Sequence, residues 1–260
     1  MMAHGGTGRG LRTMLCMSDP VLVERREAVT VVTINRPEVH NCVDTETADL
    51  LEAAVRAFDA DEQARVLVLT GAGTKSFCSG ADLKDPPRFR EAGPMGISRL
   101  EISKPSIAAI PGYCYAGGLE LACWCDFRIC DSTALFGVLN RRWGVPLIDG
   151  GTQRLPRIVG LGNALYLIET GARIDARTAL RMGLVQESVM AGKALVRAVE
   201  LADSIAGYPQ ASLRADREST LLLDGIEAEA RRGEATVGVE EMRAGLERFR
   251  SGDRPEPPSG

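Results

Sequence analysis

Short apolar segments alternate with helical patterns along the first two thirds of the chain. Apolar runs of roughly four to eight residues, bounded by glycine or other turn residues, are typical of buried strands. Such runs predict strands over 21–25, 28–36, 65–71, 106–112, 127–131 and 183–189. A turn at Glu27 separates the first two strands, which we expect to pair.

Helical spacing of apolar residues marks the segments between and after these strands. In 44–59 the apolar side chains fall on one face of a helix, for which Asp44 is the expected N-cap. A second helix is expected over 117–125. Beyond Gly150 the pattern is almost wholly helical, with helices predicted over 151–158, 162–170, 175–182, 192–206, 209–223 and 234–250.

The order of these elements indicates an α/β protein in which a β-rich core precedes a helical C-terminal portion. A chain of 260 residues, 45% of them apolar, can bury one substantial core. We expect the core over 18–190 and the helical portion over 191–250. The N-terminal arm 1–17, where Met14 and Met17 are alternative start residues, and the charged, proline-containing tail 251–260 are expected to be disordered.

Composition excludes several classes of function. The net charge is −4 and lysine occurs only four times, so the sequence does not predict a nucleic-acid-binding face. It contains no apolar run of about 18 residues, so we expect no membrane span. Residues 1–16 lack the uninterrupted apolar stretch of a secretory signal, which favours a cytoplasmic protein.

Cysteine and histidine usage narrows the chemistry further. The seven cysteines form no CxxC pair, and the two histidines are His4 and His40, so we expect free thiols in a reducing cytoplasm and no metal site. A histidine-assisted nucleophile would depend on His40, because His4 lies in the arm. Proton chemistry therefore falls to carboxylates.

The segment 71–76, GAGTKS, imitates the end of a phosphate-binding P-loop that follows a strand. The imitation fails because Thr74, not glycine, precedes Lys75 and no glycine stands five residues before Thr74. The loop is better explained as a turn that ends a strand. Its neighbour at 78–83 can offer backbone N–H groups to a carbonyl oxygen instead.

Two glycine-rich turns carry the strongest functional signal: CSGADL at 78–83 and GYCYAGGLELA at 112–122. Together with TINRPEVHN at 33–41, GGTQRLPRIVG at 150–160 and DARTALRMGLV at 175–185, they resemble the enoyl-CoA hydratase/isomerase, or crotonase, family. The resemblance extends over about residues 20–250. It implies a crotonase ββα-spiral core with a helical C-terminal trimerisation portion, an acyl-CoA substrate and no other cofactor.

In that family, two backbone N–H groups form an oxyanion hole for the thioester carbonyl, and the resemblance assigns them to Ala81 and Gly117. A helix N-terminus presents unpaired N–H groups and partial positive charge, which suits an oxygen that becomes an enolate. Glu120 lies three residues after Gly117, hence on the same helical face, and matches the family's first catalytic glutamate. The alternative is that both segments are ordinary glycine turns and that Glu120 is a solvated residue of the helix. The apolar neighbours of Glu120 in the sequence fit poorly with a solvated position.

The family's second catalytic glutamate is replaced by Asn140, and an amide cannot donate a proton as a carboxylic acid can. A substitute acid is Asp149, because similar family branches carry a functional carboxylate near this loop. The alternative role for Asp149 is an N-cap of the following helix. If Glu120 and Asp149 share a pocket, repulsion between their charges should raise the pKa of one of them.

Coenzyme A recognition in the family uses the turn after the second strand and the first signature loop. The resemblance therefore implies contacts from Glu38, Val39, His40, Ser79, Ala81, Leu83, Lys84 and Arg248. Lys84 and Arg248 would meet phosphates, Arg248 from a neighbouring subunit of a trimer or hexamer. His40 has the alternative role of a packed turn residue. We expect residues 85–103 to shape the acyl pocket, but the sequence does not determine the path of this segment.

These observations predict an enzyme of fatty acid metabolism that acts through a thioester enolate, as an enoyl-CoA hydratase (a lyase) or an enoyl-CoA isomerase. A single carboxylate that moves a proton between two carbons would serve the isomerase. Two alternatives stay open: a catalytically weak acyl-CoA-binding or scaffold protein, and a biosynthetic C–C lyase or decarboxylase.

Overall fold

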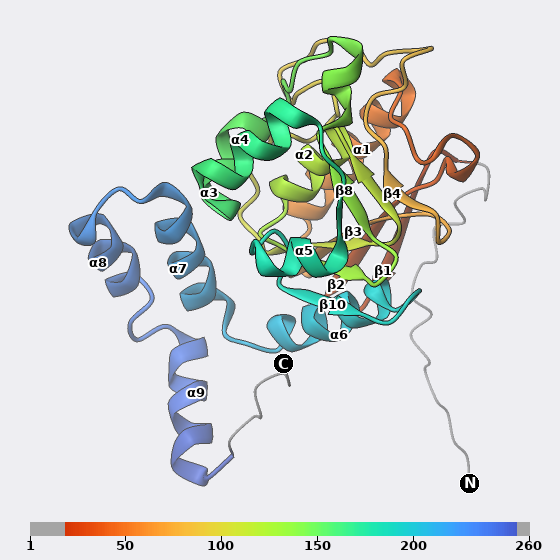
Figure 1. Ribbon diagram of the computed structural model, residues 1–260. Helices are drawn as coiled ribbons and strands as arrows, with labels where there is room; N and C mark the ends of the chain where they lie inside the picture. The colour runs from red at the N-terminus through yellow and green to blue at the C-terminus, as the bar shows by residue number, and fades with distance from the viewer. Residues whose placement is uncertain (1–18, 254–260) are drawn as a thin grey trace, which may run out of the picture.

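The computed structural model describes residues 19–253 (Figure 1). The predictions for 1–17 and for all but the first residues of the tail concern parts of the chain outside this range. The strands are β1 (Val21–Arg26), β2 (Val29–Ile34), β3 (Val66–Gly71), β4 (Ser76–Cys78), β5 (Ser106–Ile110), β6 (Tyr113–Tyr115), β7 (Phe127–Asp131), β8 (Leu135–Gly137), β9 (Ile174–Asp175) and β10 (Glu187–Val189). The α-helices are α1 (Thr45–Ala60), α2 (Gly117–Trp124), α3 (Gly151–Val159), α4 (Leu161–Thr170), α5 (Ala176–Arg181), α6 (Ala194–Ala206), α7 (Gln210–Leu222), α8 (Ile226–Glu234) and α9 (Glu240–Ser251), with 3-10 turns η1 (Pro37–Val39) and η2 (Leu139–Trp143).

A six-stranded sheet in the order β1-β2-β3-β5-β7-β10 forms the centre of the molecule. Its strands are parallel except for β1, which pairs antiparallel with β2 across the turn at Glu27. Side chains alternate between the two faces of each strand. On β3, Val66 and Val68 pack toward α6, whereas Leu67 and Leu69 belong to the larger core beneath α1 and α2. Both faces are thus buried, as the continuous apolar strands predicted.

A second sheet, in the order β4-β6-β8-β9, lies over the larger core. Successive pairs of strands contribute one member to each sheet: β3 and β4, then β5 and β6, then β7 and β8. Helix α2 follows the second pair and packs between β4, β6 and α3. This winding is the ββα spiral that the family resemblance implied.

Most predicted elements are present, and most of their ends differ from the prediction by no more than two residues. The strand predicted over 183–189 is shorter, because β10 begins only at Glu187. Asp44 is the N-cap of α1, because its Oδ1 accepts a hydrogen bond of 2.8 Å from Thr47 N. The helix predicted over 234–250 begins too early: α9 starts at Glu240, after a turn that contains Gly238 at φ +79°. Helix α8 before that turn was not predicted. Strands β4, β6, β8 and β9 were missed, since two or three residues are too few to show an alternating pattern.

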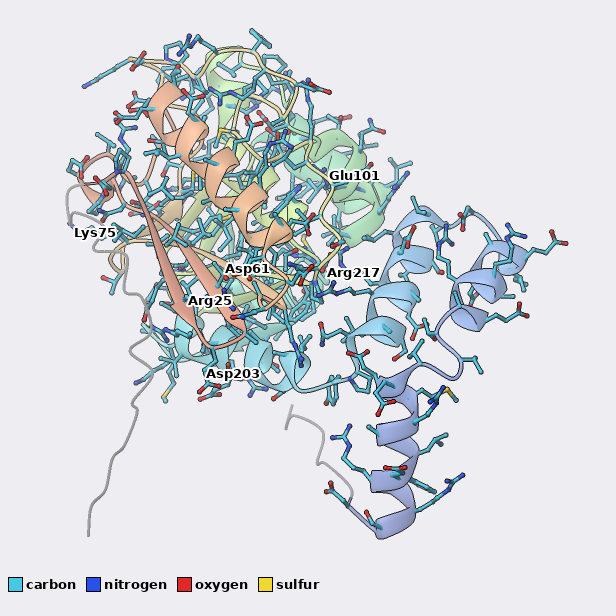
Figure 2. All side chains as sticks on the ribbon, turned by 180° about the vertical axis from the view of Figure 1, so that it is seen from behind. Arg25, Asp61, Lys75, Glu101, Asp203 and Arg217 are labelled. Carbon is cyan, nitrogen blue, oxygen red and sulfur yellow. The ribbon has the colours of Figure 1, made fainter. Side chains whose placement is uncertain are left out.

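The last three helices extend away from the body of the molecule (Figure 1). Helix α6 packs on the central sheet, and the projecting arm begins with α7. Arg217 lies on α7, where this helix approaches the body of the molecule (Figure 2). Its Nε and Nη2 donate to the two carboxylate oxygens of Asp126 over 2.8 and 2.9 Å. Its Nη1 donates to the carbonyl oxygen of Ile102 over 2.8 Å.

Two findings concern composition. Six of the seven cysteines lie within 19–253, and these six are free thiols, five of them buried. Within the same range, no helix combines the length and the hydrophobicity that crossing a bilayer requires.

We expect Arg217→Met to loosen the projecting arm while the sheets stay folded. Charge-assisted hydrogen bonds of this kind contribute roughly 2 kcal/mol, and the change leaves Asp126 without its cation. Hydrogen exchange should show faster exchange in α7, together with a lower midpoint of denaturation. The control is Arg56→Met, which removes an exposed ion pair to Glu52 and should cost less than about 0.5 kcal/mol. Equal exchange in α7 for both variants would contradict the prediction.

Candidate active site

Three neighbouring parallel strands deliver three loops to the same side of the small sheet. Cys78 on β4 lies opposite Cys114 on β6, and Tyr115 on β6 lies opposite Gly137 on β8. Because the strands run in one direction, the segments that follow them leave from the same edge. Residues of all three segments line a cavity of about 600 Å³.

The first of these loops, 79–83, is held against the second. Gly80 has φ +103°, and a Cβ on it would lie 3.1 Å from the backbone nitrogen of Gly117, so the two segments are in contact and position 80 requires glycine. On its other side the loop is held by Arg36, whose Nη2 forms ion pairs with Asp82 at 3.1 Å and Asp44 at 2.9 Å. The loop therefore has little freedom to move away from α2.

Ala81 and Gly117 both line the cavity. Within residues 19–253 neither backbone N–H donates a hydrogen bond to another residue. Gly117 begins α2, so its N–H is one of the four that a helix leaves unpaired. Ala116 directly before it has φ 51° and ψ −123°, a conformation that costs a non-glycine residue about 1–3 kcal/mol and is concentrated at functional sites.

Glu120 is 3% exposed and faces the same cavity. Its Oε1 accepts hydrogen bonds from the N–H groups of Asp149 at 2.9 Å and of Gly151, the first residue of α3, at 2.8 Å. Within the described chain, Oε2 accepts no hydrogen bond. Burial raises the pKa of Glu120 to about 7, with a smaller contribution from the Asp149 charge, and outweighs the two amide contacts that lower it.

Asp149 also faces the cavity and is 4% exposed. Its Oδ1 accepts hydrogen bonds from Met95 N at 3.0 Å and from the Ser98 hydroxyl. The alternative that Asp149 caps α3 was wrong, because the N-cap is Gly150, which has no side chain. The N-terminus of α3 is instead served by Glu120, a carboxylate from a different helix.

Asn140 lies on η2, lines the cavity and is 7% exposed. Its Nδ2 donates to the carbonyl oxygen of Val145 over 2.7 Å, which fixes the orientation of the amide. The position that would carry a second acid in the family therefore holds a neutral group engaged with the backbone.

The remaining wall is predominantly apolar and comes from the segment 83–95 and from η2 with the residues after it. Leu83, Phe89 and Trp143 are exposed at the mouth. Apolar walls with a few convergent polar groups are typical of small-molecule sites. The other apolar residues of the wall include Met95, which is buried, and Leu139, Val145 and Ile148, which are partly buried.

The structure brings most of the predicted site residues together. The cavity is lined by Ala81, Gly117, Glu120 and Asp149, and also by Val39, Ser79, Leu83 and Lys84. Glu38, His40 and Arg248 do not line it; His40 is exposed in a left-handed turn with its ring 5.6 Å from that of Tyr113, and Arg248 is on the projecting α9.

Three residues that hold the site could not be identified from the sequence: Met95, Ser98 and Arg154. Arg154 lies inside the quoted GGTQRL segment, so the motif contained it without indicating a role. Met95 and Ser98 belong to the segment whose path the sequence left open. Both residues donate to Asp149, which lies more than fifty positions further along the chain. No local sequence pattern signals contacts over such a separation.

Comparisons with known proteins agree with this architecture. A family model described as enoyl-CoA hydratase/isomerase matches residues 24–255. The chain is 36% identical to a short-chain-enoyl-CoA hydratase of Clostridium acetobutylicum, over 76% of this chain and 80% of that protein, and 39% identical to the (E)-benzylidenesuccinyl-CoA hydratase of Thauera aromatica, over 78% and 82%. The crystal structure of an enoyl-CoA hydratase from Mycobacterium marinum superimposes with a TM-score of 0.86 at 29% identity, covering 92% of this chain and 98% of that one.

We expect Glu120→Gln to stabilise the protein in a pH-dependent manner. A carboxyl whose pKa is about 7 when folded and near 4.5 when unfolded contributes stability below pH 4.5 that is lost as the pH rises through 7. The glutamine variant keeps an acceptor oxygen but cannot ionise. Its free energy of unfolding should exceed that of the wild type by up to about 3 kcal/mol at about pH 8 and converge with it near about pH 4.

Urea denaturation at a series of pH values measures this difference. The matched control is Glu62→Gln, at an exposed glutamate, which should show no such trend. A constant difference between Glu120→Gln and wild type across the pH range would show that Glu120 has an ordinary pKa.

Proposed function

The chain belongs to the enoyl-CoA hydratase/isomerase family, and we propose that it processes an acyl-CoA thioester through an enolate held by the N–H groups of Ala81 and Gly117. One observation carries the proposal. The carboxylate of Glu120, with Oε2 unpaired within the described chain, faces the same cavity as these two amides. A donor of this kind contributes roughly 3–4 kcal/mol to lowering a barrier in enzymes of known mechanism.

Hydration of a 2-enoyl thioester would use Glu120 as the general base. The carboxylate removes a proton from water, the water oxygen bonds to the β-carbon, and the π electrons move to the carbonyl oxygen between the two amides. The enolate then returns its electrons and takes a proton at the α-carbon. With a pKa of about 7, Glu120 is present in both protonation states near neutral pH, so it can give back the proton that it removed.

Isomerisation of a 3-enoyl thioester needs one carboxylate only. Glu120 would remove a proton from the α-carbon and return it to the γ-carbon of the dienolate. Asn140 supplies no proton in either reaction, so Asp149 is the second candidate acid. Because Oδ1 of Asp149 holds Met95 and Ser98, proton transfer by Asp149 would use Oδ2.

Coenzyme A would reach the cavity along Val39, Ser79, Leu83 and Lys84, with Lys84 near a phosphate at the exposed mouth. Glu38 and His40, on the adjoining turn, stay candidates for the nucleotide portion. The proposal includes no cofactor besides the thioester. The expected compartment stays the cytoplasm.

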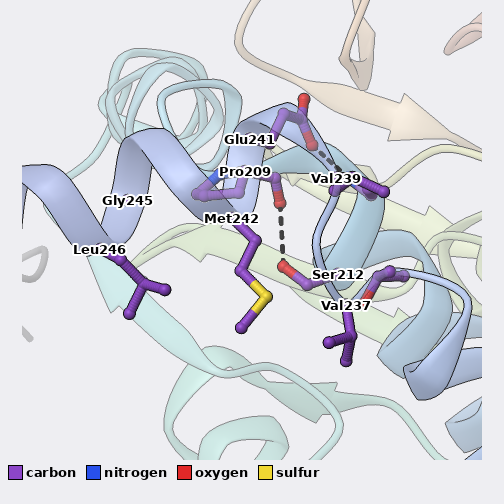
Figure 3. Close-up of a pocket in the computed structure, with 10 residues that line it drawn as sticks. Pro209, Ser212, Val237, Val239, Glu241, Met242, Gly245 and Leu246 are labelled. Atoms are coloured by element: carbon purple, nitrogen blue, oxygen red, sulfur yellow. Dashed lines mark hydrogen bonds between the residues drawn. The ribbon is translucent and has the colours of Figure 1, made fainter.

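Assembly into trimers or hexamers is part of the proposal. No residue of α8 or α9 is buried in a single chain. A groove of about 360 Å³ between the start of α7 and α9 exposes Val237, Met242 and Leu246 (Figure 3). Such apolar surface is costly in water and is typical of interfaces. Arg248 would contribute to thioester binding only from a neighbouring copy.

We expect Glu120→Gln to lower kcat/KM by about 100-fold or more, because the amide cannot accept a proton. Turnover of crotonyl-CoA and of a 3-enoyl-CoA should be measured for this variant, for Asp149→Asn and for the control Glu62→Gln. A loss in Asp149→Asn for hydration alone would identify Asp149 as the hydratase acid. Full turnover in both site variants would remove the catalytic assignment.

The same assay separates the enzyme from a binding protein. A scaffold protein would bind acyl-CoA in calorimetry without forming product in the wild type. That outcome would contradict the proposed enolate chemistry.

We expect light scattering to give a mass of three or six times the 27.9 kDa chain. Leu246→Glu with Phe249→Glu should lower that mass, because both apolar side chains are exposed on α9 in the single chain. Met190→Glu, at an exposed apolar residue outside these helices, is the control. A wild type that stays monomeric at high concentration would contradict the assembly and the contribution of Arg248.

A further inference from the structure

Two loops that are distant in sequence meet behind the carboxylates, and one arginine joins them. Arg154 lies in the first turns of α3 and reaches back toward the start of that helix. Its Nη1 donates to the carbonyl oxygen of Asp149 over 3.0 Å, and its Nη2 donates to the carbonyl oxygen of Ser98 over 2.7 Å. Since the Ser98 hydroxyl in turn donates to the Asp149 carboxylate, the three residues close a ring of hydrogen bonds.

The backbone is shaped around this guanidinium. Gly150 has φ +93°, which favours glycine, and a Cβ at that position would lie 2.2 Å from Arg154 Nη1, so a larger residue there would displace the guanidinium. On either side of Gly150 are the two N–H groups, of Asp149 and Gly151, that hold Glu120. The arginine thus fixes the segment that presents both donors to the Glu120 carboxylate.

The positive charge of Arg154 is directed at carbonyl oxygens, so it acts on the nearby carboxylates through space. Burial is the largest influence on the pKa of Glu120 and raises it, the charge of Asp149 raises it further, and the charge of Arg154 lowers it by a smaller amount. The other titratable neighbour is Cys123 on α2, a thiol whose pKa burial raises to about 11, so it is uncharged near neutral pH. Arg154 is therefore the cation that opposes Asp149 at Glu120.

We propose that Arg154 is a positioning residue for the proposed reaction: its guanidinium joins the loops that carry Ser98 and Asp149, so that the N–H groups of Asp149 and Gly151 stay directed at the Glu120 carboxylate. The proposal rests on the proposed function of Glu120. A residue that only braced α3 could be replaced without affecting the titration of Glu120, whereas loss of the two N–H contacts would raise the pKa of that carboxyl.

The test compares Arg154→Gln, which keeps donors but loses the charge, with Arg154→Lys, which keeps the charge but loses the planar fork. Each variant is combined with Glu120→Gln, and urea denaturation against pH gives the pKa of Glu120 in each background. Both variants lose the planar fork and should raise that pKa, by roughly half a unit to one unit in Arg154→Gln and by less in Arg154→Lys, which keeps the charge. Arg157→Gln, at an exposed arginine of the same helix, is the control and should cause no shift.

The pH dependence of kcat/KM should show the same pattern, with the rising limb at higher pH in both variants than in the wild type. An unchanged pKa of Glu120 in Arg154→Gln would overturn the proposal. If Arg154→Gln does not fold, Arg154→Lys decides: a raised pKa of Glu120 would support the role of the fork, and an unchanged pKa would contradict it. Failure of the enzymatic assay would overturn the proposed function. The pKa of Glu120 could still be compared between the variants, because the stability measurement needs no turnover.

Discussion

The cavity depends on parallel hydrogen bonding among three strands that are only three residues long, β4, β6 and β8. Their common direction delivers three loops to one edge, so the N–H groups of Ala81 and Gly117 belong to segments in contact. Strands this short are marginal by themselves. They persist because the larger core, in which Phe77, Cys114 and Phe136 are fully buried, lies beneath them. The site is therefore placed by the packing of the two sheets.

Within this frame, the properties of Glu120 result from two opposed effects. Two backbone N–H groups and the N-terminus of α3 favour the carboxylate, and burial disfavours it. Burial is the larger effect, since the pKa rises to about 7 instead of falling. The difference corresponds to about 3 kcal/mol, which the rest of the fold has to supply when Glu120 ionises. A carboxyl balanced in this way is suited to remove and return a proton at neutral pH.

Much of the fold could be predicted from the sequence because the signal is local. The alternation along β2, β3 and β5 separates the two faces of the central sheet, and Asp44 marks the start of α1 within three residues of its hydrogen-bond donor. The turn between α8 and α9 was missed, as were the short strands, because too few residues carry the pattern. The division between core and C-terminal portion near residue 190 stays a prediction, and α6, which follows it, packs on the central sheet.

The sequence by itself determined the order of strands and helices, the glycine turns that carry Ala81 and Gly117, the family and the position of Glu120 within one turn of Gly117. The tertiary structure alone decided what surrounds that glutamate. It turned the Asp149 carboxylate toward Met95 and Ser98, fixed the Asn140 amide on Val145 and placed Arg154 behind the loop. These arrangements join loops whose closest approach is set by packing in three dimensions, whereas periodicity along the chain reports only on neighbours within a few residues.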